Sequence, residues 1–192
     1  MEKKHIITIA GKLGSGKSST AKRLAEILGY KHYSAGDFMR SMANERGISL
    51  AELGQIAETD DSVDQEIDKK NLEVGETKDS VIDSRLGFHF IPQSFKVFLE
   101  LDPSVASERI LKDKETNINR LNESSENFDT QEDIMKSIND RLQSERNRYK
   151  KIYGIEDLTD HNHFDLVIDT AQIPLEEVSQ KIIEEYNKWL NK

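Results

Sequence analysis

The sequence predicts an α/β fold in which helices cover both faces of a five-stranded parallel sheet. Short apolar runs rich in β-branched residues alternate along the chain with segments of helical periodicity. The first apolar run leads directly into a glycine-rich loop, and a helix follows that loop. Strands that alternate with helices at this spacing form βαβ units, whose strands are parallel and buried. A chain of 192 residues has the size of one such domain, so we expect a single domain over residues 1–192.

The predicted strands are the apolar runs Ile6–Ala10, Lys31–Ser34, Ser80–Asp83, Phe95–Leu99 and Asp165–Asp169. The predicted helices are Ser18–Leu28, Gly36–Arg46, Val63–Val74, Gln131–Tyr153 and Pro174–Leu190, with two more that begin near Ser49 and Pro103, the latter running to about Lys112. Ser49 starts a Ser-x-x-Glu capping box, and proline is favoured early in a helix. The polar composition of Val63–Val74 predicts a helix at the surface. Glu115–Asp129 is rich in Asn, Ser and Glu, so we expect it to project as a loop.

Composition and charge exclude several classes of protein. The chain is 35% hydrophobic and 33% charged, and its formal net charge of −9 disfavours nucleic acid or an anionic membrane as a partner. It has no cysteine, so disulfides, thiolate metal sites and cysteine nucleophiles are excluded. No apolar run approaches the roughly 20 residues of a membrane helix. We therefore expect a cytoplasmic globular protein, and we expect it to be a monomer.

The glycine-rich loop at Gly11–Ser18 matches the pattern G-x-x-x-x-G-K-[ST]. Its glycines allow backbone conformations in which successive N–H groups point at phosphate oxygens, and the next helix adds its positive end. Lys17 is expected to reach the β- and γ-phosphates of ATP, and the Ser18 hydroxyl to bind Mg²⁺. A chance glycine-rich turn is the alternative, but the strand before the loop and the helix after it favour phosphate binding. The residues assigned to ATP are Gly11, Lys12, Leu13, Gly14, Ser15, Gly16, Lys17, Ser18 and Ser19.

Loops of this kind occur in kinases, GTPases, motor ATPases and ABC-type modules, so other residues must decide between these classes. Arg40 and Arg85 each follow a predicted strand, and ligands of open α/β sheets bind at the carboxyl ends of the strands. Both are candidates to bind the phosphate of a second ligand, because a guanidinium holds phosphate with two hydrogen bonds. Asp83 ends the third strand and is a candidate to hold Mg²⁺ through water. Taken singly, each arginine is better explained as a surface charge; together with Asp83 and the loop, the phosphate role is favoured.

Further segments carry a recognisable order of motifs. They are Ser34–Arg40 (SAGDFMR), Met42–Leu50 (MANERGISL), Glu66–Asp68 (EID), Ser84–Gly87 (SRLG), Ser107–Ile110 (SERI), Arg148–Ile155 (RYKKIYGI) and Phe164–Thr170 (FDLVIDT). In this order, and after the phosphate loop, they resemble the nucleoside monophosphate kinases, most closely the archaeal-type cytidylate kinases. The resemblance implies a P-loop sheet with an acceptor-binding helical section at residues 36–75 and a lid at about residues 113–150. It also implies that ATP and CMP react to give ADP and CDP, with dCMP and UMP as further acceptors. Arg109 is then a residue for ATP, and Asp37 joins Arg40 and Arg85 as a substrate-binding residue.

Three charged residues of the predicted long helix share one face, because Arg141, Glu145 and Arg148 are spaced i, i+4 and i+7. The spacing is similar to the lid element of cytidylate kinases, which implies that Arg141 and Arg148 stabilise charge on the transferred phosphate. With Lys17 and Arg85 they form the expected catalytic set. Without that resemblance, a solvated helix with i,i+4 ion pairs explains the spacing equally well.

The sequence departs from the family at Asp113, where the family carries an arginine at the entrance to the lid. Arg120 is a candidate to replace that arginine. His161 and His163 have the spacing of a metal-binding pair, but no carboxylate cluster surrounds them in the sequence, so we assign no metal to them.

Two other functions stay open. The residues that recognise the base are not assigned, with Asp37 and Asp68 as candidates, so an adenylate kinase or another small-molecule kinase on the same scaffold is the nearest alternative. The second alternative is a nucleotide-binding regulatory ATPase without acceptor activity. Asp113 and the long polar segment after it leave that alternative open.

Overall fold

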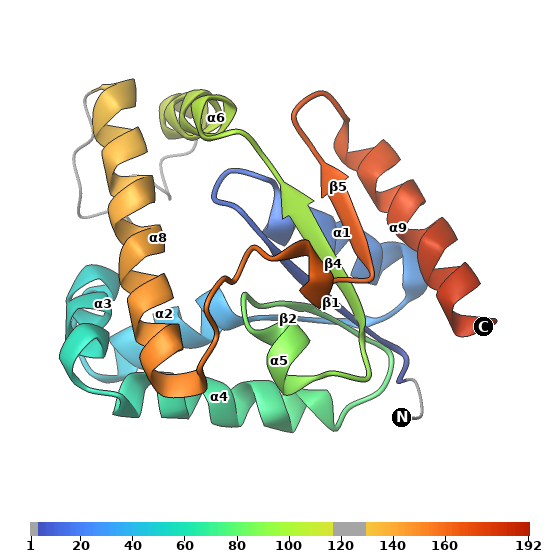
Figure 1. Ribbon diagram of the computed structural model, residues 1–192, viewed down its shortest axis with the longest axis horizontal. Helices are drawn as coiled ribbons and strands as arrows, with labels where there is room; N and C mark the ends of the chain where they lie inside the picture. The colour runs from blue at the N-terminus through green and yellow to red at the C-terminus, as the bar shows by residue number, and fades with distance from the viewer. Residues whose placement is uncertain (1–3, 117–129) are drawn as a thin grey trace.

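The protein folds around one parallel β-sheet. The computed structural model describes residues 4–116 and 130–192, and within them the sheet has five strands in the order β2-β3-β1-β4-β5 (Figure 1). The strands are β1 (Ile6–Gly11), β2 (Lys31–Ser34), β3 (Ser80–Asp83), β4 (Phe95–Glu100) and β5 (Leu166–Asp169), and every neighbouring pair is parallel. The predicted α/β fold is confirmed, and each predicted strand lies within one residue of its observed ends.

The helices connect these strands and lie close to their predicted ranges. They are α1 (Lys17–Leu28), α2 (Ala35–Glu45), α3 (Leu50–Thr59), α4 (Ser62–Gly75), α5 (Gly87–Phe90), α6 (Pro103–Thr116), α8 (Gln131–Tyr153) and α9 (Leu175–Leu190), with a 3₁₀ turn η1 (His161–His163). Ser49 caps α3 through the predicted capping box, and Gly29 ends α1 at a φ of +68°. Helix α6 continues to Thr116, beyond its predicted end. The short elements α5 and η1 are not evident from the sequence, because a single turn is too short to show helical periodicity.

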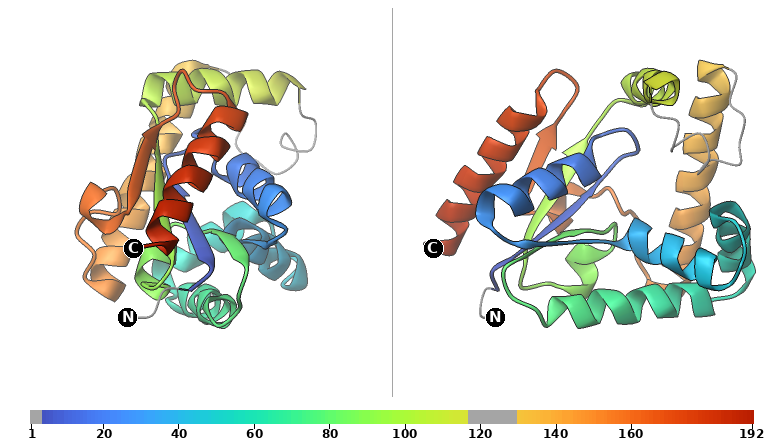
Figure 2. Two further views of the ribbon diagram at one scale, coloured as in Figure 1. Left: turned by 90° about the vertical axis from the view of Figure 1, so that its right-hand side faces the viewer. Right: turned by 180° about the vertical axis from the view of Figure 1, so that it is seen from behind.

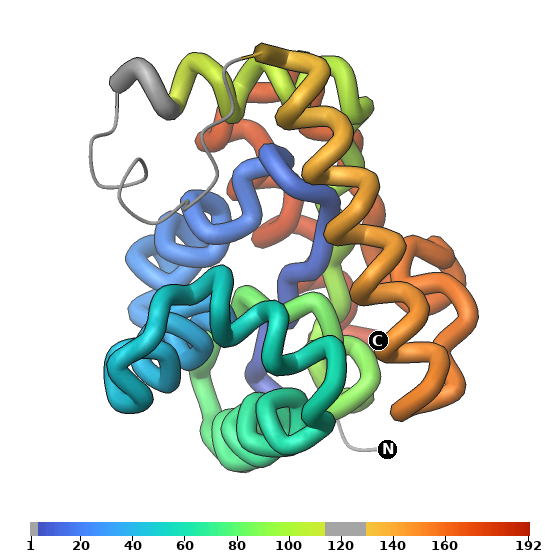
Figure 3. Tube along the Cα trace, turned by 90° about the vertical axis from the view of Figure 1, so that its left-hand side faces the viewer, coloured from blue at the N-terminus to red at the C-terminus, as the bar shows by residue number. Residues whose placement is uncertain are grey.

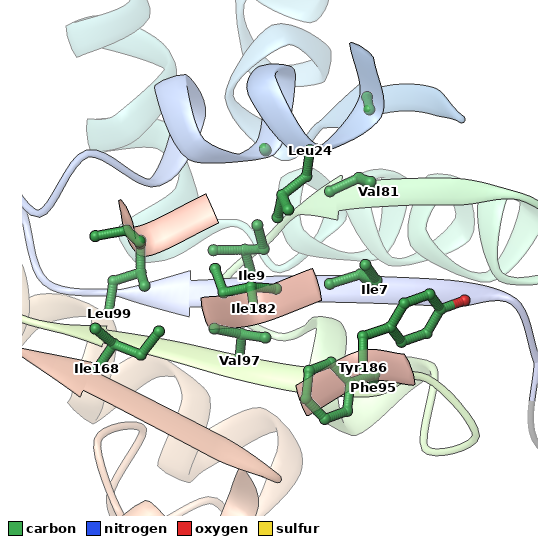
Figure 4. Close-up of a cluster of buried hydrophobic side chains, with 13 residues drawn as sticks. Ile7, Ile9, Leu24, Val81, Phe95, Val97, Leu99, Ile168, Ile182 and Tyr186 are labelled. Atoms are coloured by element: carbon green, nitrogen blue, oxygen red, sulfur yellow. The ribbon is translucent and has the colours of Figure 1, made fainter. Parts of the chain in front are cut away.

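Helices α1 and α9 cover one face of the sheet. The largest apolar cluster of the described residues lies between these helices and the strands (Figure 4). Leu24 of α1 and Ile182 and Tyr186 of α9 are almost fully buried there, together with Ile9 and Val97 of the sheet. Burying each side chain of this size stabilises the fold by roughly 1.5–3 kcal/mol. The cluster therefore holds β1 in place, and with it the loop that follows β1.

The opposite face is covered by α4, α5 and the segment that precedes β5. In the left view of Figure 2, this last segment and α1 lie on opposite sides of the sheet. Val74 of α4 packs with Ile6 and Ile82 of the sheet. The ring of Phe164, just before β5, has its centre 4.8 Å from the centre of the Phe98 ring in β4. The expectation that helices cover both faces is thus met, with an irregular segment completing the second layer.

Helices α2, α3 and α4 form a group beside the sheet. Together they make up the acceptor-binding section expected at residues 36–75. They have an apolar cluster of their own that includes Met42, Leu53 and Val63. Helix α8 begins beside α6 and runs past this group (Figures 1 and 3). Helix α4 is therefore more enclosed than the surface helix predicted from its polar composition, and Asp64 and Asn71 are only 4% and 1% exposed.

The structure does not describe the whole of the predicted lid. Arg120 and most of the predicted loop Glu115–Asp129 lie outside the described residues. Within residues 4–116 and 130–192, no helix is long and apolar enough to span a bilayer.

Candidate active site

The phosphate loop connects β1 to α1 and takes a shape that requires glycine. Gly11 has a φ of +152°, and a Cβ on it would lie 2.4 Å from the carbonyl oxygen of Leu99. Gly14 has a φ of +74°, and its Cβ would lie 3.1 Å from the Cα of Ala106. The loop therefore packs directly against β4 and α6, and its backbone follows a path closed to residues with a side chain.

Polar groups line this loop. The Lys17 ammonium folds back and donates to the carbonyl oxygen of Lys12 at 3.0 Å. Lys12 forms an ion pair with Glu100 at the end of β4. The Ser15 hydroxyl is buried and makes no hydrogen bond within the described residues, so a phosphate in the loop would supply an acceptor that it lacks. The loop thus fits the phosphate chain of a nucleotide.

Ser18 and Asp83 come together beside the loop, as a shared role in metal binding requires. The Ser18 hydroxyl donates to Asp83 Oδ2 at 2.5 Å, and Asp83 is 7% exposed. A hydroxyl and a carboxylate are oxygen ligands of the kind that Mg²⁺ prefers. The pair therefore fits Mg²⁺, either directly or through water.

Arg85 and Arg141 meet at one buried carboxylate. Arg85, which follows β3, forms an ion pair with Glu145 of α8. The other oxygen of Glu145 accepts from Arg141 Nε at 3.1 Å. Burial, and next the charge of Arg141, lower the pKa of Arg85 to about 10, so it remains a cation near neutral pH. Two cations expected to bind phosphate are thus gathered around Glu145, which is 6% exposed.

Arg148 has a different partner from Arg141, although both lie on α8. Its Nε lies 2.8 Å from Oδ2 of Asp64 in α4. Its guanidinium also lies over the ring of Tyr149, 5.1 Å from the ring centre. Burial raises the pKa of Asp64, while the charge of Arg148 acts in the opposite direction. The i, i+4, i+7 spacing therefore does not bring the two arginines of α8 to the same carboxylate.

Arg40, like Arg85, follows the carboxyl end of a strand. It lies on helix α2, which comes after β2. Ser34 at the end of β2 pairs with Asp83 at the end of β3, so the residues that follow both strands start side by side. Arg40 forms an ion pair with Asp37 on α2, and Arg40 and Asp37 are 39% and 55% exposed. The contacts of Arg40 and Arg85 are thus with different carboxylates, at neighbouring strand ends.

Arg109 contacts the segment after β5. Its Nη2 donates to the carbonyl oxygens of Thr170 and Ala171 at 2.7 and 3.0 Å. Thr170 in turn donates through its hydroxyl to the Ser15 carbonyl oxygen at 3.2 Å. The segment after β5 is therefore a part of the site. The spacing of residues in the sequence does not reveal this, although Thr170 is the last residue of the FDLVIDT motif.

The acceptor section and α8 share a second buried contact. The Tyr153 hydroxyl donates to Oδ2 of Asp68 at 2.5 Å. Burial raises the pKa of Asp68, and the hydrogen bond from Tyr153 opposes that effect. Burial also raises the pKa of Tyr153, and the hydrogen bond to Asp68 adds to it. Asp68 was a candidate for base recognition, and in the structure it is held by a tyrosine of α8.

The two histidines before β5 have other partners. His161 lies 3.3 Å from Glu100, and His163 stacks on Phe88 with ring centres 4.6 Å apart. Within the described ranges, no group of three or more His, Cys, Asp or Glu side chains is arranged to hold a metal ion.

Comparison with known proteins decides the family. The model of the cytidylate kinase-like family matches residues 6–172 of this chain. The chain belongs to that family. It is therefore a cytidylate kinase-like P-loop kinase, an ATP-dependent phosphotransferase, which confirms the resemblance seen in its motifs.

The relatives of this chain include cytidylate kinases and a longer protein of another name. The chain is 36% identical to a cytidylate kinase of Natronomonas pharaonis, over 88% of this chain and 82% of that one. It is 37% identical to a cytidylate kinase of Aeropyrum pernix, over 92% of this chain and 95% of that one. It is also 38% identical to a protein of Lacinutrix mariniflava named S-adenosylmethionine-dependent nucleotide dehydratase, where the match covers 95% of this chain but only 36% of that protein.

Solved structures share the fold of this family member at low sequence identity. An uncharacterised protein from Eubacterium ventriosum superposes with a TM-score of 0.67 at 14% identity, over 97% of this chain and 98% of that one. A shikimate kinase from Bacteroides thetaiotaomicron gives a TM-score of 0.60 at 13% identity, with the same coverage. These neighbours confirm the P-loop kinase fold.

Proposed function

We propose that the protein transfers the γ-phosphoryl group of ATP to CMP and gives ADP and CDP, with dCMP and UMP as further acceptors. The observation that carries this proposal is the meeting of Arg85 and Arg141 at Glu145. These cations lie at the end of the sheet that carries the phosphate loop, where a second phosphorylated ligand of an α/β kinase would bind. Family membership supports a nucleoside monophosphate as that ligand.

Phosphoryl transfer depends on positioning and charge neutralisation more than on covalent chemistry of the protein. The amides of the phosphate loop and Lys17 hold the phosphates of ATP. Ser18 and Asp83 would hold Mg²⁺, which neutralises charge on the transferred group. No general base is needed, because the phosphate of the acceptor is already an anion near neutral pH.

On the acceptor side, Arg40 and Arg85 bind the acceptor phosphate, next to Asp37. Arg141 supplies charge to the transferring group from α8, and its carboxylate partner Glu145 keeps it beside Arg85. Closure of the lid over the site excludes water, which would otherwise compete as an acceptor. Arg148, the second arginine proposed to stabilise this charge, is held by Asp64 in the acceptor section, whereas Arg141 is held by Glu145.

A panel of acceptors tests the proposal. ADP formation is measured with CMP, dCMP, UMP, AMP and GMP, and CMP is expected to give the highest kcat/KM. A preference for AMP would show an adenylate kinase instead. If no monophosphate accelerates ADP formation and Arg85→Ala leaves ATP turnover unchanged, the protein is a regulatory ATPase without an acceptor.

One observation favours a nucleotide dehydratase as an enzyme that uses the product of this reaction. Nearly the whole chain matches a 36% portion of the Lacinutrix protein named as a nucleotide dehydratase. A kinase of this family would supply phosphorylated nucleotide to such an enzyme. Incubating the Lacinutrix dehydratase with S-adenosylmethionine and the nucleotide made by this kinase, and following nucleotide consumption by chromatography, tests this pairing.

A further inference from the structure

Lys12 of the phosphate loop forms an ion pair with Glu100, the last residue of β4. The pattern of the loop accepts any residue at this position, so a lysine here is not part of the general phosphate-binding motif. The main chain of Lys12 has other partners. Its N–H donates to the Leu99 carbonyl oxygen at 3.1 Å, and its carbonyl oxygen accepts from Lys17 at 3.0 Å. The backbone of the loop thus does not account for the ammonium of Lys12.

The ion pair of Lys12 and Glu100 is one that an anionic ligand can open. The two side chains are 29% and 24% exposed, so water reaches both of them. An ion pair that water reaches contributes little to stability, because each charge is also well solvated when the pair is apart. The other carboxylate oxygen of Glu100 lies 3.3 Å from His161 Nε2, so Glu100 keeps a neighbour when the ammonium leaves.

Lys12 and Arg85 line one small cavity beside the phosphate loop, together with Phe98 of β4 and Leu142 of α8. They meet there because Lys12 follows β1, Arg85 follows β3, and these two strands are paired. The cavity measures about 20 Å³, which holds a water molecule but not a phosphate group. A phosphate bound by Arg85 would therefore lie outside the cavity, and the flexible side chain of Lys12 would leave Glu100 to reach it.

We propose that the Lys12 side chain binds the phosphate of the acceptor nucleotide beside Arg85, and that Glu100 is a positioning residue that holds Lys12 while the acceptor site is empty. The inference rests on the proposed monophosphate kinase function. A phosphate monoester carries between one and two negative charges near neutral pH and offers three acceptor oxygens. It therefore attracts the ammonium more strongly than the single charge of the Glu100 carboxylate, and the ammonium exchanges partners when the acceptor binds.

This exchange gives one residue a task for each substrate. The backbone of Lys12 belongs to the loop assigned to the phosphates of ATP, and its side chain serves the acceptor. Both substrates are anions that must lie close together for phosphoryl transfer. A cation that extends from the loop toward the acceptor reduces the repulsion between them, so the acceptor binds more tightly beside ATP.

The test measures kcat and the separate KM values for CMP and ATP in Lys12→Met of the full chain. Lys12→Met is expected to raise KM for CMP about tenfold, because a hydrogen bond to a charged group is lost. The KM for ATP should change less than about twofold, since the backbone of the loop is kept, and kcat should fall less than KM for CMP rises. Lys12→Arg keeps the charge and should restore most of the affinity for CMP.

Lys96→Met is the matched control. Lys96 lies near the start of β4, at the other end of the strand from Glu100, and pairs with Asp165 at 3.3 Å. The side chains of Lys96 and Asp165 are 21% and 27% exposed, close to the values for Lys12 and Glu100. Removing this pair should leave both KM values unchanged.

Glu100→Gln is expected to have the opposite effect to Lys12→Met. The KM for CMP should fall about threefold, because the ammonium no longer has to leave a carboxylate when the acceptor binds. In the double variant Lys12→Met/Glu100→Gln, the second substitution should leave KM for CMP where Lys12→Met puts it. A pair that serves structure alone would instead weaken the enzyme when either partner is removed.

The outcomes separate this inference from the proposed function. If the wild type phosphorylates CMP but Lys12→Met changes its KM no more than Lys96→Met does, acceptor binding by Lys12 is wrong and the kinase function stands. A rise in KM for ATP in place of CMP would assign the side chain to ATP and overturn the inference in the same way. A rise in KM for CMP in Glu100→Gln would overturn the exchange between Glu100 and the phosphate. If the wild type phosphorylates no monophosphate, the proposed function fails, and this inference fails with it.

Discussion

The hydroxyl of Ser18 donates a hydrogen bond to Oδ2 of Asp83 at 2.5 Å, although the two residues are 65 positions apart in the chain. Ser18 lies in the first turn of α1, and Asp83 is the last residue of β3. Because β3 pairs directly with β1, the end of β3 lies beside the start of the phosphate loop. One neighbouring strand thus places the second oxygen ligand proposed for Mg²⁺.

Asp83→Asn is predicted to reduce kcat by about a hundredfold, because the amide holds a cation less well than the carboxylate where charge develops. The measurement is ADP formation at saturating ATP over a series of Mg²⁺ concentrations, and the variant should need more Mg²⁺ than the wild type. Asp79→Asn is the control, since Asp79 is exposed and its φ of +53° suits asparagine. Equal Mg²⁺ dependence in Asp83→Asn and the wild type would remove Asp83 from the metal site.

Gly11→Ala is predicted to destabilise the protein by about 2–3 kcal/mol, because the new Cβ would overlap the Leu99 carbonyl oxygen. Gly54→Ala is the matched substitution in α3, where a Cβ would meet nothing within 4 Å. It is expected to stabilise the fold by about 0.5–1 kcal/mol, since alanine loses less conformational entropy than glycine in a helix. Urea unfolding measures both, and a similar effect of the two substitutions would contradict the tight packing of the loop.

Glu145→Ala is predicted to reduce the free energy of unfolding by about 3 kcal/mol, because it leaves the buried charge of Arg85 without its carboxylate. Glu156→Ala removes an ion pair in which Lys150 and Glu156 are 58% and 74% exposed. Exposed pairs contribute little, so this control should change stability by less than about 0.5 kcal/mol. Chemical denaturation followed by circular dichroism distinguishes the two, and equal effects would mean that Glu145 is solvated in solution.

The pH dependence of stability should report on Asp68, whose pKa is raised mainly by burial. Such a carboxyl keeps its proton to higher pH in the folded state than in the unfolded state. Its contribution to stability therefore declines as pH rises from the unfolded pKa of about 4 through the folded pKa. Asp68→Asn removes this decline, so the stability of the variant relative to wild type should increase with pH over that range.

Urea unfolding of the wild type and Asp68→Asn at a series of pH values from about 4 to 7 measures this difference. A constant difference between the two proteins across the series would show that the pKa of Asp68 is the same in both states. Asp60→Asn is a useful comparison of opposite sign. The backbone and side chain of Ser62 lower the pKa of Asp60, so its favourable contribution is present above the unfolded pKa and is lost as pH falls through the lower folded pKa.

The sequence by itself determined the elements, their order and the phosphate loop, because these depend on local patterns. Apolar runs and helical spacing are properties of consecutive residues, and the glycines of the loop encode its backbone path directly. The capping box at Ser49 is equally local, and it was predicted correctly.

Only the tertiary structure decided which charges meet. Spacing on α8 placed Arg141 and Arg148 on one face, yet Glu145 and Asp64 hold them separately, because α8 crosses from the sheet edge to the acceptor section. The burial of Asp64 was hidden for the same reason, since a polar helix appears exposed until another helix packs on it. Contacts between distant segments depend on how layers pack, and no local pattern of residues contains that information.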